Sequence, residues 1–332
     1  MAAETTIGAN TIRLFARLVH NLILANGPNF GSCSMSNVLS RETRISVLHH
    51  LVEGNTLRST SRLTGVHRTT IMNLMVEFGT ACQAYMDRTM RGLTLDHIEV
   101  DEMWTFVGKK QARLTTDERA ERHDLGDVYL WTALDAETKL VAAYLVGKRS
   151  ADNARRLMTD LSHRLVFPAP HASDAHAYQK SKQITITQIS TDGFAGYPEA
   201  VDLAFGPYAK FGVIIKQYKN ARMQYDPSEM VGTERKPVKG EINPWSICTS
   251  HVERHNLTVR TLMKRFTRLS LGFSKKLENL EAAVAMFLAY YNYVWRTRDA
   301  IEGGQRTPAA MAAGVVNNLW SFERMYDEMT AA

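Results

Sequence analysis

The distribution of apolar and polar residues changes character twice along the chain. Over residues 41–80 it predicts three short helices, Arg41–Val52, Leu57–Thr64 and His67–Gly79. Residues 81–96 continue as a linker that we expect to be helical. An all-α region is therefore predicted before any sheet begins.

A glycine separates the second and third of these helices. Ser61 lies four residues before Gly65. Apolar residues follow at offsets that let the third helix pack across the second, namely Val66, Ile71 and Leu74. This arrangement is typical of a helix-turn-helix unit. The residues that its second helix would offer to a DNA groove are His67, Arg68, Thr69, Thr70 and Asn73. A helical hairpin without any ligand is the alternative.

An alternating pattern replaces the helical one in HIEVDEMWTFVG. The apolar residues of one parity in this segment are Ile98, Val100, Trp104 and Phe106. Residues 126–147 follow as two strands joined by a turn. SADNARRLMTDLSHRL is then a helix with Ser150 in the N-cap position. Three strands and a helix are therefore expected in this part of the chain.

Further elements alternate in the same way. The β-branched strand in QITITQISTDGFAGY stops at Asp192, a short helix covers residues 196–205, and FGVIIKQY forms another strand. An irregular basic insertion at 219–248 precedes two long helices, Ser250–Leu269 and Lys276–Arg298. Such an order predicts a mixed sheet covered by helices on both faces. The predicted fold class is α/β, an RNase H-like mixed sheet preceded by an all-α helix-turn-helix region.

Positive charge is concentrated in one third of the chain. The 332 residues carry a formal net charge of +6, with 45% hydrophobic and 22% charged residues. Between residues 210 and 276 the local net charge is +9, which exceeds the surplus of the whole chain. A locally basic region of this kind favours a polyanionic partner, as a phosphate-binding surface does.

Composition also excludes several classes of protein. No run of about 18 apolar residues exists, so a membrane span is not expected. The short apolar stretch near the start lacks the form of a secretory signal. The three cysteines are far apart and form no CxxC pair, which argues against a zinc ribbon and against a disulfide framework. A cytoplasmic location, nucleoid-associated in a prokaryote, is the expectation.

Three acidic residues occupy positions that an RNase H-like sheet would bring together. Asp101 lies within the first strand, Asp192 ends the later parallel strand, and Glu253 lies in the first turn of the following long helix. Mg²⁺ prefers oxygen ligands and is held by few carboxylates. Two such ions can stabilise both the attacking and the leaving oxygen of a phosphodiester. We therefore predict a centre with two Mg²⁺ ions, which Mn²⁺ could replace.

Each acid also has a structural alternative. A lone Asp in a strand is usually at an edge or faces solvent, and Asp192-Gly193 is also a common turn. Ser250 and Glu253 have the spacing of a capping box, in which the glutamate would only accept a backbone N–H.

The helix that carries Glu253 has two distinct faces. Arg260 and Lys264 follow Glu253 at seven and eleven residues, and Arg268 continues this basic stripe. The face expected to bury against the sheet consists of Val252, Val259, Met263 and Phe266. The stripe predicts a helix that contacts DNA beside the metal centre, with a solvated surface as the alternative.

Three segments resemble the transposases of insertion sequence one, a branch of the DDE transposase family. They are HIEVDEMWTFVGKK, ISTDGFAGY and SHVERHNLTVRTLMKRF. The resemblance spans roughly residues 41–315 and includes RTPAAMAAG near the end. It implies an RNase H-like fold, DNA strand transfer, and the element's own terminal repeats as partner. It also implies catalytic metals on the three acids and a DNA contact by Arg260.

One departure from the family pattern lies at the N-terminus. Relatives often begin with a cysteine zinc ribbon, whereas this segment contains only Cys33. We therefore expect no zinc and assign no role to residues 1–40. The expected partners are double-stranded DNA, as element ends and target, and further copies of the chain in a homodimer or larger synaptic complex.

The expected domain organisation follows from these segments. It comprises an N-terminal helical segment (1–40), the helix-turn-helix domain (41–80), a linker helix (81–96), the catalytic domain with its insertion (97–300) and a C-terminal tail (301–332). The candidate DNA contacts are Arg58, His67, Arg68, Thr69, Arg260, Lys264, Arg265 and Arg268. Two alternative functions are a retired DNA-binding regulator and a nuclease that cuts without joining.

Overall fold

The computed structural model describes residues 38–166, 186–219, 229–267, 270–296 and 306–331. Residue contacts divide the chain into residues 1–40 and residues 41–332. The predictions for residues 1–37 and the DNA contact predicted for Arg268 lie outside the described residues.

The helical region begins with three helices. Helices α2 (Arg41–Val52) and α3 (Leu57–Thr64) have the predicted bounds, but α4 (Arg68–Thr89) extends ten residues beyond the expected end at Gly79. Helix α3 ends because Gly65 adopts a left-handed conformation with φ of 72°. The Ser61 hydroxyl donates to the Val66 carbonyl and braces this turn.

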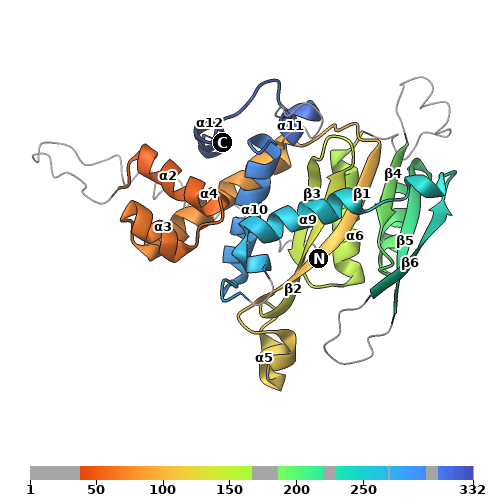
Figure 1. Cartoon of the computed structure of the whole chain (residues 1–332), viewed down its shortest axis with the longest axis horizontal. Coiled ribbons are helices and arrows are strands. Elements are labelled where there is room, and N and C mark those ends of the chain that lie inside the picture. Colours follow the sequence, from red (N-terminus) through yellow and green to blue (C-terminus); the bar gives the residue numbers. More distant parts are fainter. Residues whose placement is uncertain (1–37, 167–185, 220–228, 268–269, 297–305, 332) are drawn as a thin grey trace, which may run out of the picture. The chain divides into compact units, whose positions relative to one another are not determined.

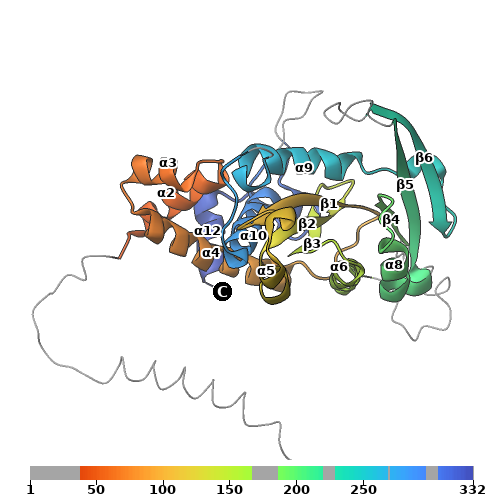
Figure 2. The same cartoon turned by 90° about the horizontal axis from the view of Figure 1, so that it is seen from below.

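Helix α4 extends because its second half is buried against α10 (Leu277–Tyr293). The two backbones approach closely at Gly79, where an added Cβ would overlap the carbonyl of Ala282. Figures 1 and 2 show the two helices side by side. Helix α4 therefore joins the helical region to the sheet domain as one continuous element.

The sheet has six strands in the order β3-β2-β1-β4-β5-β6. Their bounds are β1 (His97–Val107), β2 (Gly126–Asp135), β3 (Val141–Gly147), β4 (Thr187–Thr191), β5 (Ala209–Lys219) and β6 (Glu229–Lys239). Strands β1, β4 and β5 run parallel to one another, and the remaining pairs are antiparallel. The first five strands have the RNase H-like order, so the predicted fold class is confirmed.

Helices cover both faces of this sheet. In Figure 2, α9 (Ser250–Leu262) lies on one face, and α6 (Ala151–Arg164) and α8 (Tyr197–Phe205) lie on the other. The four residues predicted to bury against the sheet are all buried: Val252 and Val259 lie on α9, and Met263 and Phe266 lie just beyond its end.

The basic insertion differs from its prediction. We expected residues 219–248 to be irregular, but Glu229–Lys239 forms strand β6 and pairs antiparallel with β5. The short 3-10 helix Pro244–Ser246 follows it. A repeated alternation is absent from this charged segment, so its sequence does not reveal a strand. The strand forms because the edge of β5 offers backbone N–H and C=O groups for hydrogen bonding.

The two long helices are both shorter than predicted. Helix α9 ends at Leu262 rather than Leu269, and α10 spans Leu277–Tyr293 rather than Lys276–Arg298. Met263 adopts an extended conformation after α9, and a 3-10 turn, Lys264–Phe266, follows. This turn buries Phe266, so burial of an aromatic side chain competes with continuation of the helix.

Burial along β1 differs between its two halves. Ile98 and Val100 are buried as predicted, but Trp104 and Phe106 are only partly buried. Met103, Thr105 and Val107 are buried in their place. The Thr105 hydroxyl donates to the Arg265 carbonyl, so the turn after α9 covers this face of the strand.

Segments outside the predicted elements also contain helices. Helix α5 (Thr116–Glu121) lies in the connection between β1 and β2. The expected C-terminal tail contains α11 (Ala309–Ala312) and α12 (Phe322–Thr330). Helix α12 packs on α4, where the Tyr326 and Phe78 rings stack with centroids 5.4 Å apart. No helix among the described residues is long and apolar enough to cross a membrane.

Candidate functional site

The register between two parallel strands places Asp101 and Asp192 at one position in the sheet. Val100 of β1 pairs with Thr191, the last residue of β4. Asp101 follows Val100, and Asp192 follows Thr191. Both carboxylates therefore lie where β4 ends. The sequence placed these two acids correctly relative to the strands.

A third acid, Glu102, joins them. Carboxylate oxygens of Asp101, Glu102 and Asp192 lie within 4.8 Å of one another. Because β4 ends at Thr191, no strand among the described residues pairs with β1 on that side at residues 101 and 102. Sequence analysis missed Glu102, although an acid that directly follows Asp101 in an otherwise apolar strand was an available signal.

Glu102 is held by two partners on the α8 side of the sheet. Its side chain is only 1% exposed. The Arg149 guanidinium donates to it at 2.8 Å, and the Tyr197 hydroxyl donates to it at 3.1 Å. Arg149 also lies 3.5 Å from an Asp192 oxygen and packs over the Phe194 ring at 4.5 Å. Arg149 therefore bridges two of the three acids.

The cluster carries more negative charge than its neighbours neutralise. Burial, together with the charges of Glu102 and Asp192, raises the pKa of Asp101 to about 7. Burial also raises the pKa of Glu102, with Asp192 adding to the rise and Arg149 opposing it. A cation between these oxygens would offset the repulsion.

The donor set fits a hard divalent cation. All three groups offer carboxylate oxygens, which Mg²⁺ and Ca²⁺ prefer, and no thiol or imidazole belongs to the cluster. Asn256 of α9 adds an amide beside them. Its Nδ2 donates to Asp101 at 2.7 Å, while its Oδ1 is buried without a partner among the described residues.

Glu253 has other partners in this structure. It forms an ion pair with Lys216 of β5 and accepts a hydrogen bond of 2.7 Å from the Thr249 hydroxyl. In the part of the chain that the structure describes, it is not a member of the carboxylate cluster. Its position one helical turn before Asn256 still directs it to the side of α9 that approaches Asp101.

The capping-box interpretation of Glu253 is wrong. The N-cap residue of α9 is Thr249 rather than Ser250, and the Thr249 side chain forms no capping hydrogen bond. The start of the helix is capped from the sheet instead. Glu99 of β1 is fully buried and accepts from the backbone N–H groups of His251 and Val252, at 2.8 and 2.9 Å.

This contact determines where α9 lies. Glu99 and Asp101 are two residues apart on β1 and share one face of the strand. The carboxylate of Glu99 fixes the helix N-terminus, where negative charge is favourable, and Asp101 contacts the helix one turn further on. Sequence reasoning missed Glu99, because a single acid in a strand does not identify its partner.

The candidate DNA contacts of the helical region lie at the start of α4 and α3. His67 is the N-cap residue of α4, where its Nδ1 accepts from the Thr69 N–H at 3.3 Å. Arg68, Thr69 and Arg58 are exposed. Their side chains are accessible to a ligand at the surface.

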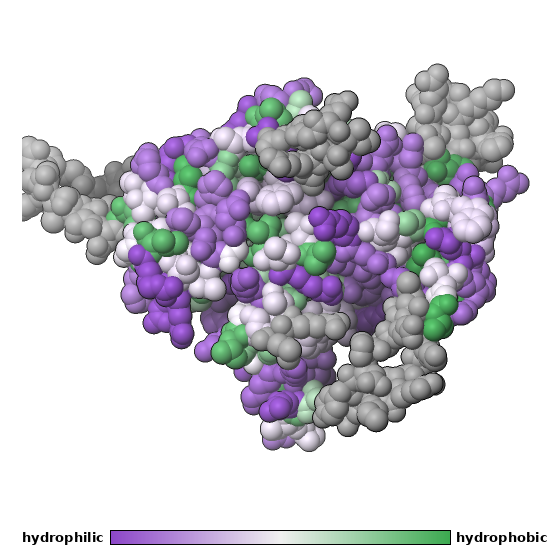
Figure 3. Space-filling view, in the orientation of Figure 1, coloured by the Kyte–Doolittle hydropathy of each residue, from purple (hydrophilic) through white to green (hydrophobic). Residues whose placement is uncertain are grey.

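The predicted basic stripe beyond Glu253 does not lie on one helix, because α9 ends between Arg260 and Lys264. Arg260 is partly exposed near the end of the helix. Lys264 is exposed in the 3-10 turn that follows, so the predicted helical column stops before it. Arg265 is partly buried, with hydrogen bonds to Ser274 and Met75. The face that carries α9 is mainly hydrophilic, with apolar residues dispersed over it (Figure 3).

Comparison with known proteins yields matches to transposases. A family model described as IS1 transposase matches residues 231–294. Insertion element iso-IS1n protein InsB of Shigella dysenteriae is 25% identical over 190 residues, which are 57% of this chain and 92% of that protein. The matched region covers α9 and α10 and therefore includes Glu253 and Asn256.

Solved structures with local similarity are also transposases. A piggyBac transposase synaptic complex with hairpin DNA is 9% identical, with a TM-score of 0.36 over 93% of this chain and 74% of that chain. A Mos1 transposase paired-end complex with the left transposon end is 12% identical, with a TM-score of 0.18 over 61% of this chain and 67% of that chain. These TM-scores are too low to support the fold, so the evidence for the fold is the order of the strands.

Proposed function

We propose that this chain, which resembles the insertion-sequence-one family of DDE transposases, is a DNA transposase that cuts and joins DNA at the ends of its element. The observation that carries the proposal is the convergence of the Asp101, Glu102 and Asp192 carboxylates where β4 ends. The resemblance to transposases supplies the reaction class. The locally basic region from 210 to 276 supports a DNA partner.

Asp101 and Asp192 would hold the divalent cations, which we propose to be Mg²⁺. Glu253 would complete the site from α9, and Glu102 is a second candidate for this third position. Bound in pairs, such ions stabilise the attacking and leaving oxygens of an in-line displacement. The residues of the chain orient the carboxylates: Asn256 holds Asp101, and Arg149 holds Glu102 near Asp192.

The bound DNA would lie along the α9 side of the sheet. The start of α4 would read the element ends, and Arg260 would contact the phosphate or base next to the scissile bond. Arg260 lies seven residues after Glu253, about 10.5 Å along the helix axis. That separation is too long for a metal ligand and suits a contact with the neighbouring nucleotide.

Purified protein with labelled DNA from the ends of the element, in Mg²⁺ or Mn²⁺, tests the proposal. Asp101→Asn and Asp192→Asn should each abolish cleavage and joining and leave DNA binding nearly unchanged, because Asn keeps the shape but loses the charge. An exposed acid in α5, changed in Asp117→Asn, is the matched control and should retain full activity. Substantial cleavage by either of the first two variants would contradict the proposal.

Comparison of Glu253→Gln with Glu102→Gln in the same assay identifies the third metal ligand. If Glu253 holds the cation, Glu253→Gln abolishes activity, and Glu102→Gln reduces it only through the lost Arg149 contact. The opposite ranking would assign the position to Glu102. The alternative of a retired regulator predicts no cleavage by the wild-type chain, and the alternative of a nuclease predicts cleavage without joining.

A further inference from the structure

A cavity that is separate from the carboxylate cluster lies at the end of α9. It has a volume of about 590 Å³ and lies between the α2–α3 turn, the end of α9 and α10. This volume is within the usual range for ligand sites, about 300–1,000 Å³. Its apolar lining includes Leu57, Met75, Leu262, Leu271, Phe273 and Phe287. The cavity thus joins the helix-turn-helix region to the end of the helix that carries Glu253.

All charged residues that line this cavity are positive. They are Arg58, Lys264, Arg265 and Lys275, and no Asp or Glu belongs to the described lining. A cavity whose charged groups share one sign favours a ligand of the opposite sign.

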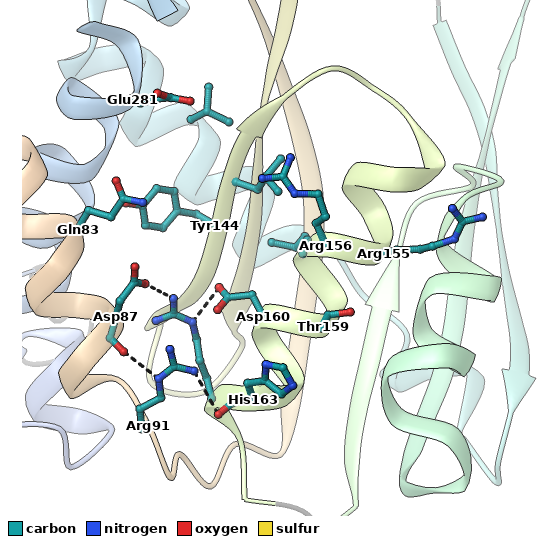
Figure 4. Close-up of a pocket in the computed structure, with 14 residues that line it drawn as sticks. Gln83, Asp87, Arg91, Tyr144, Arg155, Arg156, Thr159, Asp160, His163 and Glu281 are labelled. Atoms are coloured by element: carbon teal, nitrogen blue, oxygen red, sulfur yellow. Dashed lines mark hydrogen bonds and ion pairs between the residues drawn. The ribbon is translucent and has the colours of Figure 1, made fainter. Parts of the chain in front are cut away.

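The polar pocket between α4 and α6 provides a contrast (Figure 4). There the Arg164 guanidinium is paired with both Asp87 and Asp160. The lining also contains Glu281, so positive and negative groups are mixed. Cationic side chains alone are therefore a poor indicator of an anion site in this chain, and the absence of acids from the first cavity is what distinguishes it.

Arg265 is the most constrained of the four cations. Its Nε donates to the Ser274 hydroxyl at 2.9 Å and its Nη2 to the Met75 sulfur at 3.5 Å. Within the described residues it has no carboxylate partner. Burial lowers the pKa of Arg265 to about 10, so the guanidinium stays charged at neutral pH. A partly buried charge without a counterion is costly, and a bound anion would reduce that cost.

We propose that this cavity binds one phosphate of a DNA strand, with the attached sugar or base against the apolar wall. The proposal rests on the proposed function and extends it by giving the bound strand a second fixed point. Thr105, whose hydroxyl donates to the Arg265 carbonyl, lies four residues after Asp101 on β1, or about 13 Å.

Two exposed leucines provide a matched test of this cavity. Leu271 lines it and is 95% exposed, whereas Leu203 lies on α8 and is 68% exposed. Neither side chain is part of the core, so Leu271→Asp and Leu203→Asp should both fold. Binding is measured with a 30-base-pair duplex of random sequence in EDTA. Leu271→Asp should weaken affinity about tenfold, and Leu203→Asp should leave it unchanged.

The salt dependence of the same binding provides a second measurement. Lys275→Ala and Arg265→Gln should each lower the slope of log affinity against log salt concentration by about one, as expected for one lost phosphate contact. Lys276→Ala is the neighbouring control, because Lys276 pairs with Glu278 and does not line the cavity. Its slope should equal that of the wild type.

The outcomes separate this inference from the proposed function. Wild-type affinity and slope in Leu271→Asp and Lys275→Ala would overturn the phosphate site, even if the wild-type chain cleaves DNA. Weakened binding in these variants, without cleavage by the wild type, would support the site and contradict the transposase proposal. Because the assay contains EDTA, neither result depends on a bound metal.

Discussion

At the scale of single residues, the most informative side chain is Asp101. It is partly buried, accepts from Asn256, and has two further carboxylates nearby. The fold thus concentrates negative charge at a position where a neutral side chain of the same shape would be more stable. Such a conflict between stability and charge is expected at sites that bind a cation.

The conflict predicts the effect of pH on stability. Burial and neighbouring acids raise the pKa of Asp101 from 3.8 to about 7. Between these values the folded chain keeps a proton that the unfolded chain has released, so the aspartate lowers stability as pH rises through this window. In EDTA, Asp101→Asn should therefore be more stable than the wild type above pH 7, by up to about 4 kcal/mol.

Urea denaturation at pH 4 and pH 8 measures this difference in the free energy of unfolding. The advantage of Asp101→Asn should be absent at pH 4, and added Mg²⁺ at pH 8 should reduce it by stabilising only the wild type. Asp117→Asn is exposed and should match the wild type at both values. Equal stability of wild type and Asp101→Asn at pH 8 would contradict the charge argument.

At the scale of elements, the contact between α4 and α10 links two parts of the fold. Helix α4 begins at the helix-turn-helix region and packs along α10, and the Gly79 backbone approaches Ala282. Glu99 performs a comparable task for α9 by accepting from its first N–H groups. In both places the residue type permits the close contact.

The Gly79 crossing predicts a large effect from one methyl group. Gly79→Ala improves helix propensity by about 1 kcal/mol, but its Cβ would overlap the Ala282 carbonyl and force the helices apart. A net loss of about 2 kcal/mol or more in the free energy of unfolding is expected. Thr80→Ala, on the exposed side of the same helix, is the control and should change stability by less than about 0.5 kcal/mol. Urea denaturation that finds Gly79→Ala as stable as the wild type would contradict the close crossing.

At the scale of the whole molecule, recognition and chemistry are expected to use different surfaces. Arg68 is exposed at the start of α4, and Arg260 lies near the end of α9. The first belongs to the helical region, and the second belongs to the helix that contacts Asp101. We expect these two regions to contribute differently to DNA binding.

Substitutions of Arg68 and Arg260 separate these contributions. Arg68→Ala should weaken binding to element ends more than binding to random DNA, because a groove contact distinguishes sequences. Arg260→Ala should weaken both equally and slow strand transfer on pre-cleaved ends, and Arg260→Lys should recover part of that rate because the charge remains. Full strand transfer by Arg260→Ala would eliminate its DNA contact. An unchanged preference for element ends in Arg68→Ala would eliminate the proposed recognition helix.

The order of elements and the position of two acids could be derived from the sequence, because both depend on local patterns. Helix and strand periodicity gave α2, α3 and the main strands, and the parallel pairing of β1 with β4 follows from the element order. Asp101 and Asp192 follow paired residues of these strands, so their proximity needs no knowledge of side-chain packing.

The partners of the other acids and the end of α9 were decided only by the tertiary structure, because they depend on contacts between residues that are distant in sequence. Glu102 joins the acids because β4 ends beside it and Arg149 and Tyr197 hold it. Glu253 has the same local sequence as a capping residue, but Lys216 and Thr249 are its partners here. Helix α9 stops at Leu262 because the next turn buries Phe266, a preference that helix propensity does not contain.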